Sequence, residues 1–223
     1  MDRYPSTVVS TTRVSALTTN KVLRNTYLLL SATLAFSAVM AGVSMALNFP
    51  NLGLITLLIY FGLLFATHKT QNSAWGLVWV FALTGFLGLT LGPLLNAYLS
   101  AYANGGELVM IALGTTAVTF LGLSAYAIRS ERDFSFLGGF LTIGIIGAFV
   151  LGLVAYFFNM PTLALVVSGM FVVAMAGLIL FQTSAIVRGE ETNYIMATVT
   201  FYVSLYNLFT SLLHLLGFAS GED

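Results

Sequence analysis

The sequence predicts an all-α integral membrane protein, a bundle of seven transmembrane helices, from three observations. Hydrophobic residues make up 58% of the 223 positions and charged residues only 7%, a composition that excludes a water-soluble domain. Apolar runs of about 20 residues, the length that crosses a bilayer, recur along the chain. These runs do not alternate with a period of two residues, so we expect helices rather than a closed β-barrel.

Seven apolar runs are expected to form the helices, each spanning or nearly spanning a hydrocarbon core of about 30 Å at about 1.5 Å per residue. They cover residues 26–47, 52–67, 75–95, 107–128, 136–158, 163–187 and 195–217. The second run is the shortest. The first run is disfavoured as a cleaved signal peptide, because it is long and a polar segment precedes it.

The chain is expected to form one membrane domain with short ends. Residues 26–217 make up the membrane domain. Residues 1–25 are rich in Ser and Thr and poor in large apolar residues, so we expect a flexible cytoplasmic N-terminal tail. Residues 218–223 are expected to form a short external C-terminal tail.

The basic residues predict the orientation. They precede the first run or lie between the second and third, the fourth and fifth, and the sixth and seventh runs: Arg3, Arg13, Lys21, Arg24, Lys69, Arg129, Arg132 and Arg188. The connections on the other side contain no Lys or Arg. By the positive-inside rule we expect a cytoplasmic N-terminus and an external C-terminus. Losing or adding one run would destroy this alternation.

Small residues in the third and fifth runs predict close helix contacts, because helices in lipid associate through tight packing. These residues are Gly85, Gly88 and Gly92 in the third run, and Gly138, Gly139, Gly144, Gly147 and Gly152 in the fifth. We therefore expect both helices to be central. Pro93 directly follows Gly92 and is expected to kink the third helix. A kink for packing is favoured, and a broken helix that lines a cavity is the alternative.

Polar side chains mark the last two runs. One helical stripe in the seventh run consists of Thr200, Ser204, Asn207 and Ser211, continued by His214. The sixth run ends with Gln182, Thr183 and Ser184. Such stripes ordinarily make hydrogen bonds between helices, worth about 0.6 kcal/mol each. We favour this interpretation over the alternative, a polar path through the membrane.

The runs carry little catalytic or ion-coupling chemistry. None has Asp, Glu, Lys or Arg in its middle, which argues against a proton- or voltage-driven machine. GLSA at 122–125 and VVSG at 166–169 each lack one glycine of a GxSG motif, and His214 is the only base within a run. Intramembrane serine proteolysis is therefore disfavoured.

The absence of cysteine excludes further kinds of function. The chain has no cysteine, which removes thiol catalysis and thiolate metal sites. We predict a protein that is not an enzyme, that uses no cofactor or metal, and that binds the lipid bilayer but no nucleic acid. The mixed charges of RSERDFS at 129–135 are interpreted as a solvated turn rather than a site.

Four segments resemble the Bax inhibitor-1 family, and the match extends over essentially the whole chain. They are KVLRNTYLLLSATLAFSA at 21–38, FALTGFLGLTLGPLLNAYLS at 81–100, RDFSFLGGFL at 132–141 and ETNYIMATVTFYVSLYNLFTSLLHLLGFAS at 191–220. SFLGG and SLYNLF are the most specific parts. Within the family the chain is most similar to the YccA branch, whose members modulate the FtsH protease in the bacterial inner membrane.

The resemblance implies a bundle in which six helices surround the last one. It also implies a regulator that binds and limits a membrane-anchored AAA protease of the FtsH type, together with associated membrane regulators. The alternative is a pH-sensitive calcium or cation leak channel. Calcium-leak members carry paired aspartates on the last two helices, and the matching positions here are Gln182 and Ser204. Neither side chain titrates near neutral pH or supplies an anionic oxygen to calcium.

Topology and resemblance together predict how the protease engages this chain. A cytoplasmic AAA protease must grip an unfolded segment, and each cytoplasmic connection has seven residues held at both ends by helices. We therefore expect the protease to grip the N-terminal tail, which contains Met1, Arg3, Arg13 and Lys21. We call this segment the handle. Slow extraction of the first helix would make the protein a slowly degraded substrate.

Overall fold

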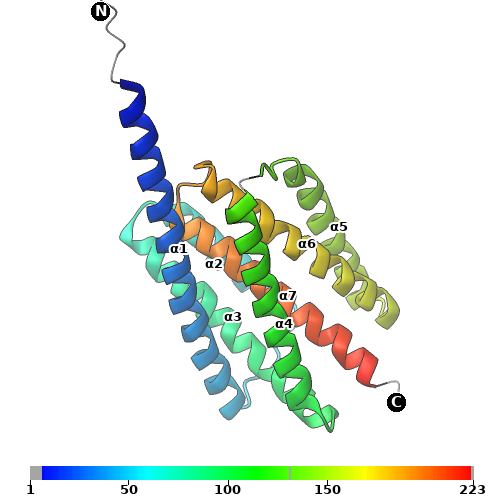
Figure 1. Cartoon of the computed structure of the whole chain (residues 1–223). Helices are drawn as coiled ribbons and strands as arrows, with labels where there is room; N and C mark the ends of the chain where they lie inside the picture. Colours follow the sequence, from blue (N-terminus) through cyan, green and yellow to red (C-terminus); the bar gives the residue numbers. More distant parts are fainter. Residues whose placement is uncertain (1–6, 131, 222–223) are drawn as a thin grey trace, which may run out of the picture.

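The computed structural model describes residues 7–130 and 132–221, and side chains from Lys21 onward. These residues form seven α-helices and no strand (Figure 1). The helices are α1 (Thr7–Ala46), α2 (Ile55–Thr70), α3 (Ala74–Ala101), α4 (Gly105–Ser130), α5 (Leu137–Phe157), α6 (Pro161–Val187) and α7 (Tyr194–Ser220). Six of them are long and apolar enough to cross a membrane. The predicted helical membrane protein is therefore confirmed.

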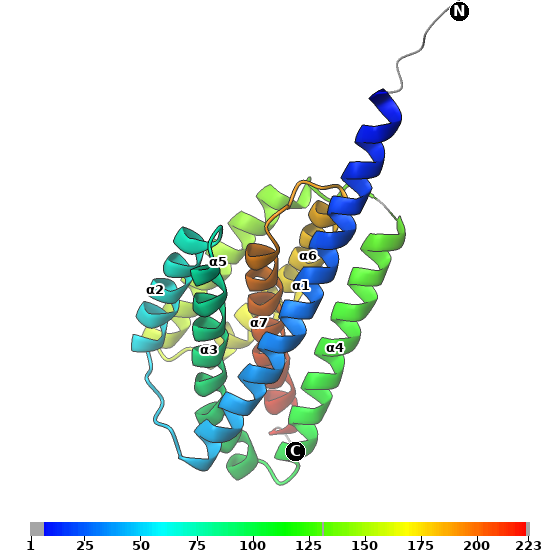
Figure 2. The ribbon, with the colours of Figure 1, turned by 90° about the vertical axis from the view of Figure 1, so that its left-hand side faces the viewer.

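Helix α2 has only 16 residues, so the number of membrane crossings depends on where its ends lie. In the last turn of α1, ten residues before α2, the carbonyl of Met45 accepts a 3.2 Å hydrogen bond from Asn96, near the C-terminal end of α3. Just after α2, the carbonyl of Gln71 accepts a 3.2 Å bond from Asn193, at the start of α7. These contacts place the end of α1 and the end of α2 at opposite ends of the bundle, and in Figure 2 the connection between the two helices runs back along the bundle before α2 begins. Seven crossings stay a prediction.

Helix α1 begins at Thr7, so the expected boundary at residue 25 is not a break in the helix. Its 40 residues make it about 60 Å long, twice the thickness of a hydrocarbon core. Part of α1 must therefore lie outside the membrane. Met1 and Arg3 lie outside the described residues, as does the side chain of Arg13. Whether the segment is flexible stays a prediction.

At the other end of the chain, α7 continues through Ser220. The first three residues of the predicted tail at 218–223 are therefore helical. We call the end of the bundle with the connections 71–73, 131–136 and 188–193 the charged end, because the Lys and Arg residues of the connections lie there or in the adjoining helix turns.

The core of the bundle is built around α7, which has the largest buried share of the six long helices. It packs against α1, α3, α4 and α6 (Figure 2). Helix α2 packs on α3, and α5 packs on α6, so these two lie at the edges. Four helices pack directly against α7, and the arrangement of six helices around it stays a prediction. Its Phe201 and Tyr202 are among the largest fully buried side chains of the described residues.

Glycines mark close helix contacts along α3, whereas most glycines of α5 contact no other helix. A Cβ atom added at Gly88 would overlap the carbonyl oxygen of Ser37 on α1, and one added at Gly92 would overlap Ser44. An added Cβ would meet nothing within 4 Å at three α5 positions: Gly139, Gly144 and Gly147. The expectation that α5 is central is wrong, because no helix lies against most of its glycines.

Helix α3 is continuous through Pro93, so the broken-helix alternative is wrong. Proline has no N–H to give to the carbonyl four residues earlier, which is that of Leu89. Ser44 of α1 donates a 2.6 Å hydrogen bond to this carbonyl. A neighbouring helix therefore satisfies the acceptor that Pro93 leaves open. The kink expected at Gly92 and Pro93 stays a prediction.

Candidate functional site

The two positions that match the family's acid pair are buried, but no hydrogen bond joins them among the described residues. Gln182 is 6% exposed and Ser204 is 0% exposed. The hydroxyl of Ser204 donates to the carbonyl of Thr200 in its own helix at 2.7 Å. The amide nitrogen of Gln182 has no partner in the part of the chain that the structure describes. The expected bond between helices is not made at this pair.

Asn207, in the same stripe of α7, also bonds within its own helix. Asn207 donates to the carbonyl of Val203 at 2.8 Å, and Ser211 is buried. Short polar side chains in a helix readily reach a carbonyl one turn earlier, which satisfies them without a partner helix. His214 differs, because its Nδ1 lies 2.8 Å from Oγ of Ser168 on α6.

Ser168 and His214 thus bring together the two residue types that serine proteolysis would need. They line a cavity of about 700 Å³ at the opposite end from the charged connections, together with Asn159. Ser168 also donates to the carbonyl of Ala164 at 3.0 Å. No carboxylate hydrogen-bonds to His214 within the described ranges, so the group that orients the imidazole in a triad is not present there. We interpret the pair as a link between α6 and α7.

Two tyrosines of α7 form side-chain links to α1 and α3, and the polar stripe predicted from the sequence does not include them. The Tyr202 hydroxyl lies 2.5 Å from Oγ of Ser37 on α1 and donates to the carbonyl of Thr84 on α3 at 3.1 Å. The Tyr206 hydroxyl lies 2.8 Å from Oγ1 of Thr90 on α3. Their spacing of four residues was the available signal, because buried tyrosine hydroxyls usually find a partner.

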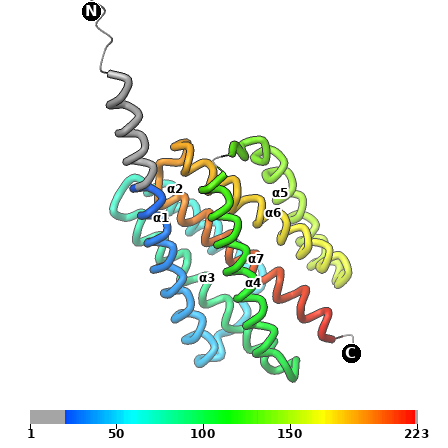
Figure 3. Tube along the Cα trace, in the orientation of Figure 1, coloured from blue at the N-terminus to red at the C-terminus, as the bar shows by residue number. Residues whose placement is uncertain are grey.

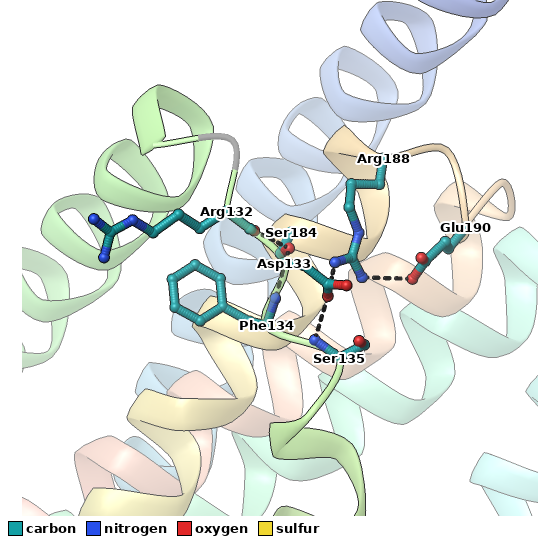
Figure 4. Close-up of polar contacts among 7 residues, drawn as sticks. All are labelled: Arg132, Asp133, Phe134, Ser135, Ser184, Arg188 and Glu190. Atoms are coloured by element: carbon teal, nitrogen blue, oxygen red, sulfur yellow. Dashed lines mark hydrogen bonds and ion pairs between the residues drawn. The ribbon is translucent and has the colours of Figure 1, made fainter.

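The connection from α6 to α7 is the centre of a polar cluster at the charged end. Arg188 forms ion pairs with Asp133, in the connection from α4 to α5, and with Glu190 at 2.7 Å (Figure 4). The Arg188 side chain is 19% exposed, whereas both carboxylates are more than half exposed. These contacts hold together two segments that are far apart in the sequence.

Ser184, in the last turn of α6, fixes the same connection by its backbone. Its hydroxyl donates to the carbonyl of Arg132 at 2.8 Å and accepts from the N–H of Phe134 at 3.4 Å (Figure 4). The carboxylate of Asp133 accepts from the N–H of Ser135 at 2.7 Å. The side chains of Arg129, Arg132, Asp133 and Ser135 are exposed, as expected of a solvated turn, and Ser184 and Arg188 hold this turn against the end of α6.

Asn193 joins the third connection to this cluster. Its Oδ1 accepts from the N–H groups of Ile195 at 2.9 Å and Met196 at 3.1 Å, which caps α7. Its Nδ2 donates to the carbonyl of Gln71 at 3.2 Å and to the side chain of Asn72 at 3.0 Å. All three connections at the charged end are thus linked through residues 184–193.

Comparisons with known proteins identify the family. The family model described as inhibitor of apoptosis-promoting Bax1 matches residues 19–221. The chain belongs to the Bax inhibitor-1 family. It is 53% identical over 224 residues, 100% of both chains, to the protein named modulator of FtsH protease YccA in Escherichia coli strain K12. It is equally similar to the inner membrane protein YccA of a second Escherichia coli strain.

The chain is also 52% identical over 204 residues, 91% of each chain, to an uncharacterised protein of Pseudomonas aeruginosa. The resemblance inferred from the sequence, including the YccA branch, is confirmed. None of these relatives is named as an enzyme.

Proposed function

We propose that this chain is an inner-membrane regulator that binds a membrane-anchored AAA protease of the FtsH type and limits its action on other membrane substrates. The name of the relative in strain K12 supports the partner, and the name of the relative in the second strain supports the location. The charged end then faces the cytoplasm and the C-terminus faces the periplasm. Associated membrane regulators of the protease are part of the proposed assembly.

One observation carries the proposed mode of engagement: the three connections at the charged end are tied to one another. The contacts that tie the connections together are made by Arg188, Ser184 and Asn193. A AAA protease needs a segment that it can pull out as an unfolded chain, and these connections offer none. The segment before Lys21 remains. The part of α1 that lies outside the membrane unfolds at little cost, because isolated helices are marginal in water.

The contacts of α1 explain why extraction would be slow. Pulling on the N-terminus separates α1 from α3, where the backbones meet closely at Gly88 and Gly92. It also breaks the bonds from Ser44 to Leu89 and between Ser37 and Tyr202. The protease would stay occupied while these contacts break, which slows its work on other substrates.

The test is reconstitution of the full chain with an FtsH-type protease in lipid. We expect the two proteins to co-purify from mild detergent, and we expect added chain to slow degradation of a second membrane substrate. The control is a soluble substrate that the same active site of the protease cleaves. If its cleavage is unchanged, the protease is undamaged and only the access of the membrane substrate is inhibited. If the chain neither co-purifies nor slows the membrane substrate, the proposed function is wrong.

Deletion of residues 2–18 tests the handle. Lys21 and Arg24 stay in place to preserve orientation. We expect the shortened protein to remain bound and inhibitory but to be degraded several-fold more slowly. A control protein with residues 2–18 replaced by a Gly/Ser segment of equal length should be degraded at the normal rate. Equal degradation of the shortened and full-length proteins would exclude the N-terminal handle while leaving the binding result intact.

A further inference from the structure

Helix α2 stops short of the end of the bundle that lies opposite the charged end. We call this opposite end the outer end, and its connections are 47–54, 102–104 and 158–160. At the charged end α2 and α3 are level, because a Cβ atom added at Gly76 would overlap the carbonyl oxygen of Thr70. From there α2 extends only to Ile55, whereas α3 extends to Ala101, ten residues further. The difference corresponds to about 15 Å.

The connection 47–54 covers part of this missing stretch without helical structure. It leaves the end of α1 and returns along the bundle before α2 begins (Figures 2 and 3). Several of its backbone groups have no hydrogen-bond partner within the residues that the structure describes: the N–H groups of Asn51, Leu52 and Leu54, and the carbonyls of residues 48–51. Asn48, Pro50 and Asn51 are exposed, so protein does not cover this backbone.

Unpaired backbone groups of this kind cannot face lipid tails. Hydrocarbon offers them no hydrogen-bond partner, and each group left unsatisfied there is costly. Irregular backbone at membrane depth is tolerated only where protein buries it or where water reaches it. Because residues 48–51 are not buried, water or polar lipid headgroups must reach them on the α2 side of the bundle.

The opposite side of the bundle stays apolar at the same depth. Helices α2 and α4 lie on opposite sides in Figure 2. A Cβ atom added at Gly105 would overlap the carbonyl oxygen of Tyr98, and this contact sets the register of α3 and α4. Counting along α2, α3 and α4 from these two contacts places Leu113 about level with Ile55. Leu113 is 52% exposed, so lipid tails contact α4 at this depth.

A polar cavity lies next to the connection 47–54. A Cβ atom added at Gly53 would lie 3.7 Å from the hydroxyl of Tyr156 on α5. Tyr156 lines the cavity of about 700 Å³ that also contains Asn159, Ser168 and His214. Such polar side chains prefer water to hydrocarbon. The polar region therefore extends from the start of α2 to the outer ends of α5 and α6.

We propose that the outer end of α2 is a contact surface for lipid headgroups and their water, at which the adjoining leaflet is locally thinned. A bilayer adapts to a short hydrophobic segment by thinning around it, and α2 is the shortest helix of the described residues. The headgroups supply the hydrogen-bond partners that the backbone of residues 48–54 needs. This inference depends neither on the protease partner nor on the orientation of the chain.

Single cysteines test the thinned leaflet, because the chain has none of its own. In lipid nanodiscs a charged maleimide reaches both membrane faces but does not enter hydrocarbon. We expect Ile55→Cys to react at least about tenfold faster than Leu113→Cys, its control at the same depth, because tails cover only the second position. Asn104→Cys, in an exposed connection, gives the rate of a fully hydrated site.

Two results would overturn the proposal. Equally slow reaction at Ile55→Cys and Leu113→Cys would show that lipid tails or another protein cover the start of α2. Equally fast reaction at both positions would show that the whole bundle is displaced toward the outer end, with no local thinning.

Lysine at the same two positions gives a second measurement, the melting temperature in nanodiscs. Ile55→Lys should change it by less than about 2 °C, whereas Leu113→Lys should lower it by about 5 °C or more, because its ammonium group lies in hydrocarbon. A cation at the N-terminal end of a helix is unfavourable, so the helix dipole cannot explain a small loss at Ile55. Equal losses at the two positions would refute the thinned leaflet.

Discussion

Ser44 on α1 donates a 2.6 Å hydrogen bond to the carbonyl oxygen of Leu89 on α3. That carbonyl lies four residues before Pro93, which has no N–H to give to it. Gly92, next to the proline, leaves the space in which α1 can approach. One contact therefore satisfies a backbone acceptor in an apolar environment and fixes the first helix against the third.

Replacing Ser44 with alanine should lower the free energy of unfolding by roughly 1 kcal/mol, because the Leu89 carbonyl is left without a partner. In a Pro93→Ala background alanine restores an N–H one turn after Leu89, so the same substitution should cost less than half as much. Unfolding of the four proteins in one detergent measures this coupling. Equal losses in both backgrounds would contradict it. Ser31→Ala is the control, since Ser31 bonds only within its own helix.

Glycine-to-alanine substitutions should have opposite signs in α3 and α5. At Gly88 the added methyl overlaps the backbone of Ser37, so Gly88→Ala should destabilise the bundle by about 1–3 kcal/mol. At Gly144 the methyl meets nothing within 4 Å, and alanine is the better helix former, so stability should rise by up to about 1 kcal/mol. Melting temperatures in detergent report both. A loss at Gly144 as large as at Gly88 would mean that α5 is covered by a partner.

Arg188→Gln should loosen the charged end with little effect on overall stability. Both carboxylate partners are exposed, so the ion pairs contribute at most about 1 kcal/mol. Amide hydrogen exchange across residues 129–136 should nevertheless become faster, because the connection from α4 to α5 loses the pair with Asp133. Arg132→Gln is the matched control, since its side chain points away from the cluster (Figure 4). Identical exchange in Arg188→Gln and wild type would show that Ser184 alone holds this connection.

The neutral pair at 182 and 204 predicts no pH-gated calcium leak. In liposomes the unmodified protein should pass little calcium, with no step in flux between about pH 6 and 8, because Gln and Ser do not titrate in that range. Gln182→Asp with Ser204→Asp should introduce pH dependence, since two nearby buried carboxylates share a proton. Gln182→Asn with Ser204→Thr is the neutral control. A steep pH-dependent flux in the unmodified protein would favour the leak channel.

Single cysteines test the orientation, because the chain has none of its own. Cysteine at Gln71 or Ser130, at the charged end, should react only with reagents in the cytoplasm. Cysteine at Asn51, Asn104 or Ser220 should react only from the periplasm. Labelling of position 220 from the cytoplasm would exclude the arrangement of seven crossings with a cytoplasmic N-terminus.

Composition and run length by themselves determined that the chain is a helical membrane protein and where its helices lie, except at the start of α1 and at the end of α3, which continues to Ala101 rather than residue 95. The reason is that lipid imposes the same requirement on every segment: each backbone polar group must be satisfied within the helix. The positions of Lys69, Arg129 and Arg188 likewise indicated which connections share one end, because that follows from counting helices.

Tertiary structure alone decided what each small or polar residue does. Glycine is equally apolar in α3 and α5. Gly88 is a site of close helix packing only because α1 lies against it. Ser204 and Asn207 have the spacing of an interhelical stripe, yet their own helix offers carbonyls that satisfy them, and Tyr202 makes the link instead. The pairing of Arg188 with Asp133 depends on two connections that meet only once the helices have packed.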